Sequence, residues 1–218
     1  MAGLVVAVDG PSGSGKSSAS RGVARELGLR YLDTGAQYRA MTWWMLEHGV
    51  EVGDQEAVAA RAAEPVLESG TDPQGPTIHV DGADVATAIR GDAVTGSVSL
   101  VAAVPEVRRR LVALQREIIG EGGIVVEGRD IGSVVAPDAT LKVYLTASAE
   151  ARANRRTAEL TGTTVEAQQA AMARRDTLDS TRKTDPLSMA AGAVELDTTA
   201  LNLEEVIATV VRLVKERA

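Results

Sequence analysis

Residues 4–17 read LVVAVDGPSGSGKS, and they contain the strongest structural signal in the sequence. Leu4–Val8 is an aliphatic run without polar alternation, which is typical of a strand buried on both faces of a parallel sheet. Gly10–Ser17 matches the pattern G-x-x-x-x-G-K-[ST], and a helix-like stretch, Lys16–Leu27, follows it and ends at Gly28. A strand, a glycine-rich loop and a helix in this order predict a loop that wraps phosphate groups.

The residue types of this phosphate loop (residues 10–17) indicate its chemistry. Its glycines let backbone N–H groups point inward at phosphate oxygens, and the following helix adds the positive end of its dipole. We expect Lys16 to reach the β- and γ-phosphates of a nucleoside triphosphate, and the Ser17 hydroxyl to face Mg²⁺. The residues predicted to bind the nucleotide are Gly10, Pro11, Ser12, Gly13, Ser14, Gly15, Lys16, Ser17 and Ser18. A glycine- and serine-rich turn that matches by chance is the alternative, and the motif leaves the phosphate acceptor open.

Outward from this stretch, strand-like and helix-like segments alternate. Further β-branched runs are Ile124–Glu127, Leu141–Leu145, Ala193–Leu196 and a weaker Leu29–Leu32. The other helix-like stretches are Gln37–His48, Pro105–Ile119, Ser148–Leu160, Val165–Asp179 and Leu203–Glu216. The alternation predicts an α/β fold with a parallel sheet, in a single domain over residues 1–218.

One segment, residues 64–92, interrupts this rhythm. Glycines and prolines punctuate it, and Thr77–Asp81 alternates between polar and apolar residues. We therefore predict a small β-rich insertion there.

Composition excludes several classes of protein. The 218 residues are 44% hydrophobic and 24% charged, as in a globular domain long enough to bury a core. The chain has no cysteine and two histidines, which excludes disulfide scaffolds, thiolate catalysis and histidine-rich metal sites. A net charge of −7 argues against a nucleic-acid polymer as partner, and no apolar run reaches the roughly 18 residues of a membrane span. No signal peptide is visible, so we expect a cytoplasmic protein without membrane contact.

Arginine is the second chemical signal, because the chain has 19 arginines and four lysines. Arg129 follows a strand-like run, and ligands bind at the carboxyl ends of strands in open α/β sheets. Arg152 and Arg156 share one helical face, as do Arg175 and Arg182. Beside a phosphate loop, these guanidinium groups predict a site for several phosphates on two nucleotides. For the second pair, a salt-bridge ladder along one helix is the alternative.

A switch GTPase is a poor match to this sequence. Its two guanine-nucleotide patterns are only partly present. Asp72–Gly75 lies in a proline-rich turn, and Lys183–Asp185 is preceded by Arg182 where asparagine belongs. Both are interpreted as chance matches.

Four motifs in order carry a resemblance to a known family. They are residues 9–16 (DGPSGSGK), 33–39 (DTGAQYR), 128–135 (GRDIGSVV) and 174–182 (RRDTLDSTR). Over nearly its whole length, the chain resembles the bacterial cytidylate kinases, nucleoside monophosphate kinases that phosphorylate CMP and dCMP from ATP. The resemblance implies a three-layer α/β/α fold with a five-stranded parallel sheet. It also implies a nucleotide-monophosphate-binding insert at about residues 64–92 and a short mobile helical lid at about residues 152–165.

The same resemblance implies a set of residues around the acceptor nucleotide. They are Asp33, Thr34, Tyr38, Arg39, Ser99, Arg108, Arg129, Asp130, Arg175, Asp179 and Arg182. Thr34 stands where the family often has serine, which keeps the hydroxyl, whereas Leu178 replaces a charged residue and loses any contact from it. The role of Asp33 is open between positioning Mg²⁺ through water and capping the next helix.

The chemistry of the base supports this set independently. Cytosine carries an amino donor at position 4, which Asp130 or Ser99 could accept, and Arg108 could donate to its N3 or O2. Uracil has an acceptor at position 4 and would face Asp130 lone pair to lone pair, at a cost of about 1–3 kcal/mol. The alternative is that Asp130 only orients Arg129.

In the expected reaction, ATP and Mg²⁺ occupy the phosphate loop and the phosphate of CMP or dCMP lies on Arg39 and Arg129. Such a transfer needs alignment and charge neutralisation more than a strong base. The expected catalytic residues are Lys16, Arg129, Arg152 and Arg156, and Arg155 is assigned to nucleotide binding. We expect a monomer that acts on small molecules. Two alternatives stay open: a kinase for UMP, AMP or another metabolite, and a regulator that binds ATP without turnover.

Overall fold

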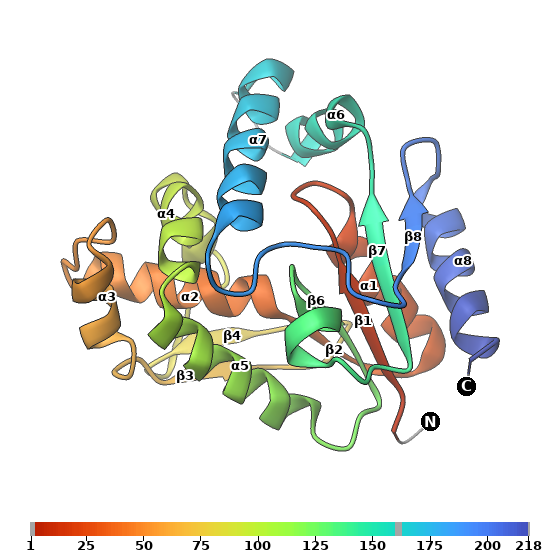
Figure 1. Cartoon of the computed structure of the whole chain (residues 1–218), viewed down its shortest axis with the longest axis horizontal. Coiled ribbons are helices and arrows are strands. Elements are labelled where there is room, and N and C mark those ends of the chain that lie inside the picture. The colour runs from red at the N-terminus through yellow and green to blue at the C-terminus, as the bar shows by residue number, and fades with distance from the viewer. Residues whose placement is uncertain (1–2, 160–162, 218) are drawn as a thin grey trace.

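The computed structural model describes residues 3–159 and 163–217. Its centre is a five-stranded parallel sheet in the order β2-β6-β1-β7-β8 (Figure 1). The strands are β1 (Val5–Asp9), β2 (Arg30–Asp33), β6 (Ile124–Glu127), β7 (Leu141–Thr146) and β8 (Val194–Asp197). The predicted parallel sheet is confirmed, and every strand begins within one residue of its predicted position.

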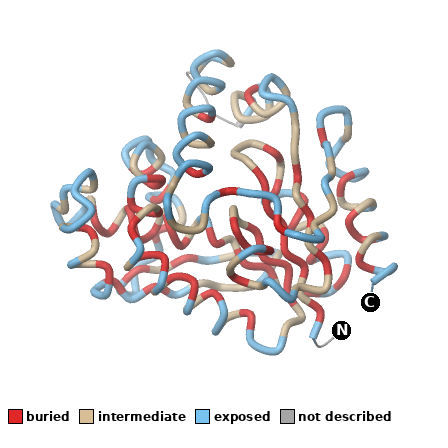
Figure 2. The backbone as a smooth tube through the Cα atoms, in the orientation of Figure 1, coloured by how far each residue is buried: buried red, intermediate tan, exposed pale blue. Residues whose placement is uncertain are grey.

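Helices cover both faces of this sheet, which makes the expected three-layer fold. α1 (Lys16–Leu27) and α8 (Leu203–Lys215) pack on one face, against residues such as Val6 and Val8 of β1. α5 (Pro105–Ile119) and the short π-helical turn η2 (Ile131–Val135) pack on the other face, against Ala7. Because successive residues of β1 point to opposite buried faces, the strand is apolar from Val5 to Val8. Figure 2 shows the central strands as the most buried part of the chain.

Five further helices complete the described residues. They are α2 (Thr34–Glu47), α3 (Gln55–Arg61), α4 (Asp92–Ala102), α6 (Ala149–Glu159) and α7 (Val165–Thr181). α2 begins three residues before its predicted start, because the Asp33 carboxylate accepts the Ala36 N–H at 2.9 Å and caps the helix. α3 and α4 were not predicted. The N-cap of α4 is Gly91, which has no side chain to cap the helix, and the helix contains Gly96. Both its N-terminal sequence signal and its intrinsic helix propensity are therefore weak.

The end of the predicted helix at Leu160 lies outside the described residues. Of the helices that the structure describes, none is long and apolar enough to cross a lipid bilayer.

The segment expected to be β-rich forms a small antiparallel sheet of β3 (Leu67–Ser69), β4 (Ile78–Val80) and β5 (Ala83–Asp84), followed by the 3₁₀ turn η1 (Ala88–Arg90). This confirms the β-rich character of residues 64–92. Ile78 and Val80 pack into one cluster with Trp44 of α2, whose Nε1 donates to Asp81 at 2.8 Å. α2 therefore joins the small sheet to the edge of the central sheet where the phosphate loop lies (Figure 1).

Candidate active site

The phosphate loop connects β1 to α1 at the carboxyl edge of the sheet. Gly10 has a φ of 146°, and a Cβ there would lie 2.1 Å from the Leu145 carbonyl oxygen, so only glycine fits. Gly15 has a φ of 85° and is the N-cap of α1. The turn brings the N-terminal end of α1 against the space enclosed by the loop, which favours an anion there.

Lys16 folds back over the loop. Its Nζ donates to the Pro11 carbonyl at 2.7 Å, and the Ser14 hydroxyl donates to the same oxygen at 3.1 Å. Burial lowers the pKa of Lys16, and the Arg129 cation acts in the same direction. A phosphate group in the loop would favour the charged ammonium, so this part of the site is suited to a polyanion.

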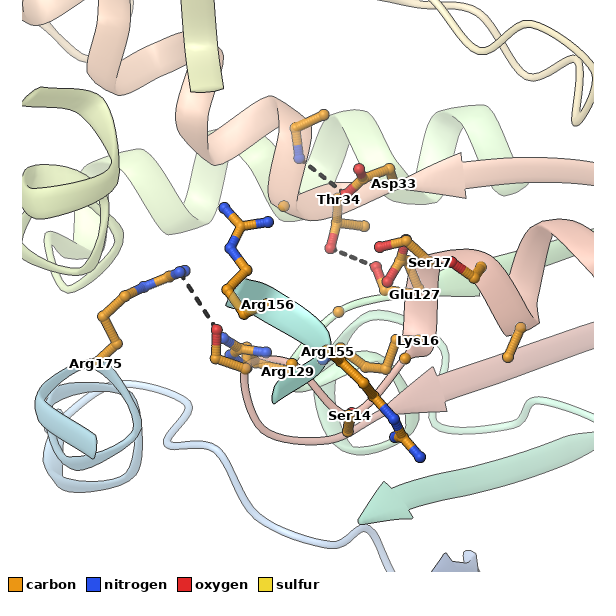
Figure 3. A pocket seen from close by; sticks show the side chains of 18 of the residues that line it. Ser14, Lys16, Ser17, Asp33, Thr34, Glu127, Arg129, Arg155, Arg156 and Arg175 are labelled. Carbon is orange, nitrogen blue, oxygen red and sulfur yellow. Dashed lines mark hydrogen bonds between the residues drawn. The ribbon is translucent and has the colours of Figure 1, made fainter. Parts of the chain in front are cut away.

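A cavity of about 610 Å³ lies over the phosphate loop and extends to α2, α4 and α7. It brings together most of the predicted site residues, although they come from widely separated segments (Figure 3). These are Ser12, Gly13, Ser14, Gly15, Lys16, Ser17, Ser18, Asp33, Thr34, Tyr38, Arg39, Ser99, Arg129, Asp130, Arg155, Arg156, Arg175, Asp179 and Arg182. The structure places Gly10, Pro11, Arg108 and Arg152 outside the lining of this cavity.

Several guanidinium groups meet in the cavity and repel one another. Burial and the nearby Arg175 and Arg156 lower the pKa of Arg39 to about 9. Burial and Arg129 lower the pKa of Arg175 to about 10. The buried Nε of Arg175 and the Tyr38 hydroxyl have no hydrogen-bond partner in the part of the chain that the structure describes. Anionic groups of a ligand would relieve the repulsion and satisfy these donors.

Arg129 links the phosphate loop to α7. Its Nη1 donates to the Gly10 carbonyl at 2.8 Å, and its Nε donates to Asp179 Oδ2 at 2.8 Å. The other oxygen of Asp179 accepts from the Ser99 hydroxyl at 2.9 Å. The alternative that Asp130 orients Arg129 is therefore wrong, because Asp179 does so.

Asp130 also lines the cavity and is 3% exposed. Arg108 Nη2 donates to its Oδ2, and Arg182 Nη2 lies 3.6 Å from its Oδ1. Burial raises the pKa of Asp130, although both arginines oppose that effect. Arg108 is 1% exposed and does not line the cavity, although it contacts Asp130 and lies over the ring of Tyr38, both of which do.

Glu127, at the end of β6, was not among the predicted site residues. It lines the cavity, accepts a hydrogen bond from the buried Tyr31 hydroxyl and is hydrogen-bonded to Ser17. Burial raises the pKa of Glu127. Its position after a buried strand, directly before the GRD motif, was a usable sequence signal, because ligands bind at such strand ends.

A magnesium ion is expected at this end of the site. The described residues contain no group of three or more His, Cys, Asp or Glu side chains that could hold a metal ion. An ion there would depend on the Ser17 hydroxyl, on Glu127 and on phosphate oxygens. Hydroxyl and carboxylate oxygens are ligands that Mg²⁺ prefers, so the residues fit the ion.

The arginines of α6 differ in their contacts. Arg152 Nη1 donates to the Ser12 carbonyl at 2.8 Å and to Asp176. Asp176 in turn accepts the Ser12 N–H at 2.9 Å. Arg155 donates to the Thr198 hydroxyl at 2.9 Å, at the end of the cavity near Ser14. Arg156 points toward the Thr34 end of the cavity (Figure 3).

The partners of Arg152 and Arg155, Asp176 and Thr198, were not predicted from the sequence. Asp176 lies inside the fourth motif but was not assigned a role. Thr198 follows β8 and has no neighbouring motif, so only the fold shows that it reaches Ser14, whose carbonyl oxygen lies 3.4 Å from its hydroxyl.

A phosphate loop at the carboxyl edge of a five-stranded parallel sheet, facing a cavity rich in arginine, defines a P-loop phosphotransferase. Two solved structures share the fold: a gluconokinase from Sinorhizobium meliloti (TM-score 0.52, 15% identity, covering 98% of this chain and 93% of that one) and a shikimate kinase from Acinetobacter baumannii (TM-score 0.50, 15% identity, covering 98% and 93%).

Sequence comparison gives the family. The family model described as cytidylate kinase matches residues 6–216. A cytidylate kinase from Streptomyces coelicolor is 61% identical over 216 residues, which cover 98% of this chain and 94% of that protein. A cytidylate kinase from Nocardia farcinica is 56% identical over 219 residues, covering 98% and 94%. The chain belongs to the cytidylate kinase family.

Proposed function

We propose that this protein is a CMP and dCMP kinase, which transfers the γ-phosphate of ATP to CMP or dCMP and yields ADP with CDP or dCDP. The observation that carries the proposal is one cavity that is lined by the phosphate loop, by buried Asp130 and by several arginines. Membership of the cytidylate kinase family supports the same acceptor.

Most of the catalytic work falls to positioned cations. Lys16 and the loop N–H groups hold the β- and γ-phosphates of ATP, and Arg39 and Arg129 hold the phosphate of CMP. That phosphate is already ionised, so no strong general base is needed. Arg156 lies between the two nucleotides and neutralises charge that spreads over the transferring group. When bound beside Ser17 and Glu127, Mg²⁺ neutralises phosphate charge and helps to align the donor.

The base is selected where Asp130 lines the cavity. The Asp130 carboxylate accepts a hydrogen bond from the 4-amino group of cytosine, and Ser99 of α4 lines the same cavity. Uracil leaves that carboxylate facing a carbonyl oxygen, which costs about 1–3 kcal/mol. Asp179 and Arg182 lie where the ribose and phosphate of the acceptor would pass.

Two segments are assigned to the binding cycle. Residues 64–92 form the insert that helps to enclose the monophosphate. Residues of about 152–165 form the lid, of which 160–162 lie outside the described residues. Closure of the lid excludes water and limits wasteful hydrolysis of ATP. We further propose that the enzyme is a cytoplasmic monomer of pyrimidine nucleotide metabolism.

The proposal is tested by coupled measurement of ADP release with ATP, Mg²⁺ and each of CMP, dCMP, UMP and AMP. We expect rapid turnover with CMP and dCMP and much slower turnover with UMP and AMP. Lys16→Ala serves as a control that separates catalysis from contaminating kinase activity. Comparable rates with UMP would keep the kinase but reject the role of Asp130. Binding of ATP without turnover on any acceptor would favour another substrate or the regulator.

A further inference from the structure

Asp185 lies in the loop after α7, outside the four motifs that carry the family resemblance. Its φ is 48°, and Asp81 is the other non-glycine residue with positive φ in the described chain. This left-handed conformation is unfavourable for a residue with a Cβ, so the surrounding contacts must hold it. Those contacts involve two arginines that face Asp130, where we propose that the base binds.

Two oxygens of Asp185 bind two different arginines. Its carboxylate Oδ2 accepts from Arg108 Nε at 2.7 Å, and its backbone carbonyl accepts from Arg182 Nε at 2.7 Å. The Nη2 atoms of both arginines face the carboxylate of Asp130. Asp185 therefore binds both guanidinium groups through their Nε atoms, while their Nη2 atoms face Asp130.

These four residues, Arg108, Asp130, Arg182 and Asp185, form a base-end network with compensating charges. The side chains of Arg108, Asp130 and Arg182 are 2%, 5% and 5% exposed, whereas that of Asp185 is 29% exposed. Asp130 and Arg182 line the cavity, and Arg108 and Asp185 do not. Asp185 thus lies outside the cavity lining, and we expect it to affect the base through its neighbours.

We propose that Asp185 is a positioning residue that sets the preference for cytosine over uracil. The inference rests on the proposed function and names a residue that determines its specificity.

The physical reason is the sign of the charge behind Asp130. With Asp185 present, two cations balance two carboxylates, and the group that faces the base is an anion that attracts an amino donor. Without it, the network carries one excess positive charge, and the Arg108 guanidinium loses the partner that fixes its rotation. Asp130 is then drawn toward the arginines, and the local potential favours the carbonyl oxygen of uracil.

The experiment compares kcat/KM for CMP and UMP in the wild type and two variants. Asp185→Gly removes the carboxylate at a φ that glycine adopts freely. Asp185→Asn keeps an acceptor for Arg108 and removes the charge, and asparagine tolerates this backbone region. Glu216→Gln, which removes a carboxylate from the exposed Arg212–Glu216 pair on the far side of the sheet, is the matched control. Thermal melting of each variant measures its folding.

We expect the CMP-to-UMP ratio of kcat/KM to fall about tenfold in Asp185→Gly and by less in Asp185→Asn. The KM for ATP and the ratio in Glu216→Gln should stay at wild-type values. A CMP analogue with hydrogen in place of the 4-amino group should bind worse than CMP to the wild type, and this difference should shrink in Asp185→Gly.

Two results would overturn the inference while leaving the proposed function intact. One is an unchanged ratio in both variants when the wild type prefers CMP. The other is a parallel loss of CMP and UMP turnover, which indicates a purely structural role. A wild type that does not distinguish CMP from UMP would reject the base-recognition part of the proposed function, and this inference with it.

Discussion

The three arginines of α6 differ in which part of the site each one contacts, and Arg156 lies near Arg39. Arg152, one turn earlier, is bonded to Ser12 and Asp176, and Arg155 is bonded to Thr198. Arg156 lines the cavity and lies close enough to Arg39 to lower its pKa. It is therefore placed to act on charge that develops between the two nucleotides.

Replacing Arg156 by alanine should lower kcat roughly a hundredfold, because a preorganised cation is lost where transition-state charge develops. The KM for CMP should change far less. Steady-state kinetics with CMP and ATP measure both. Arg174→Ala, at an exposed position of α7, is the control and should behave like the wild type. Equal losses in kcat and in CMP affinity would assign Arg156 to ground-state binding.

Most of the residues predicted from contiguous motifs line the cavity, and so do three predicted residues that lie outside those motifs, Ser99, Arg155 and Arg156. The phosphate loop and Arg129 could be placed because their chemistry depends on neighbours along the chain. Asp185 and Thr198 could not, because each gains its role from contact with a distant segment. The hydrogen bond from Arg108 to Asp130 likewise depends on how α5 packs against η2, which no local pattern reports.

Among the elements, α6 and α7 are attached to the phosphate loop through Asp176. Asp176 accepts from the Ser12 N–H and from Arg152. A Cβ at Gly13 would lie 2.9 Å from Met172 Sδ and 3.1 Å from the Arg152 carbonyl oxygen, so the helices also pack directly on the loop. Motion of these helices is thus coupled to the shape of the donor site.

Replacing Asp176 by asparagine should loosen this coupling, because the amide can accept from Ser12 but turns an N–H₂ group toward Arg152. We expect kcat to fall about tenfold, the effect of one lost charge-assisted hydrogen bond. Amide hydrogen exchange over residues 10–15 should become faster. Glu166→Gln, at an exposed position of the same helix, is the control. Unchanged exchange in the loop would show that Asp176 does not hold it.

The elements differ in how well their sequence predicted them. α1 and α5 have clear ends, Gly28 and Gly120, and a proline starts α5, so their bounds were predicted correctly. The start of α2 was misplaced because the Asp33 side chain caps the helix three residues earlier. α3 has only 7 residues, and α4 packs against α2 and α5. Tertiary contacts therefore stabilise both helices more than their local sequence does.

For the whole molecule, Asp179 joins three parts of the fold: α7, α4 through Ser99, and the end of β6 through Arg129. Burial alone would raise the pKa of Asp179, but Arg129 and the hydrogen bonds from Arg129 and Ser99 hold it below its usual range. A carboxyl with a lowered folded-state pKa stabilises the fold above its unfolded-state pKa and loses this contribution as the pH falls through the folded-state value.

Asp179→Asn should therefore lower the free energy of unfolding by about 2 kcal/mol at pH 7, because the buried Arg129 keeps only a neutral partner. At pH values below about 4, where the carboxyl of the unfolded chain takes up its proton, the difference should narrow. Urea unfolding of both proteins at pH 7 and at about pH 3 provides the measurement. Asp138→Asn, an exposed substitution, should show no such convergence. If the difference in unfolding free energy between the wild type and Asp179→Asn stayed constant with pH, Asp179 would not contribute to acid denaturation.

The strand order also determines when the central sheet can fold during translation. β1 is made first, yet it occupies the middle of the sheet, and its partners β6 and β7 pair with it from positions more than 100 residues later. The small sheet of β3, β4 and β5 is contained within residues 67–84 and can form soon after it leaves the ribosome. A nascent chain therefore holds its hydrophobic first strand without a final partner through more than half of translation. Because the phosphate loop is fixed by β1, nucleotide cannot assist folding until most of the polypeptide has been made.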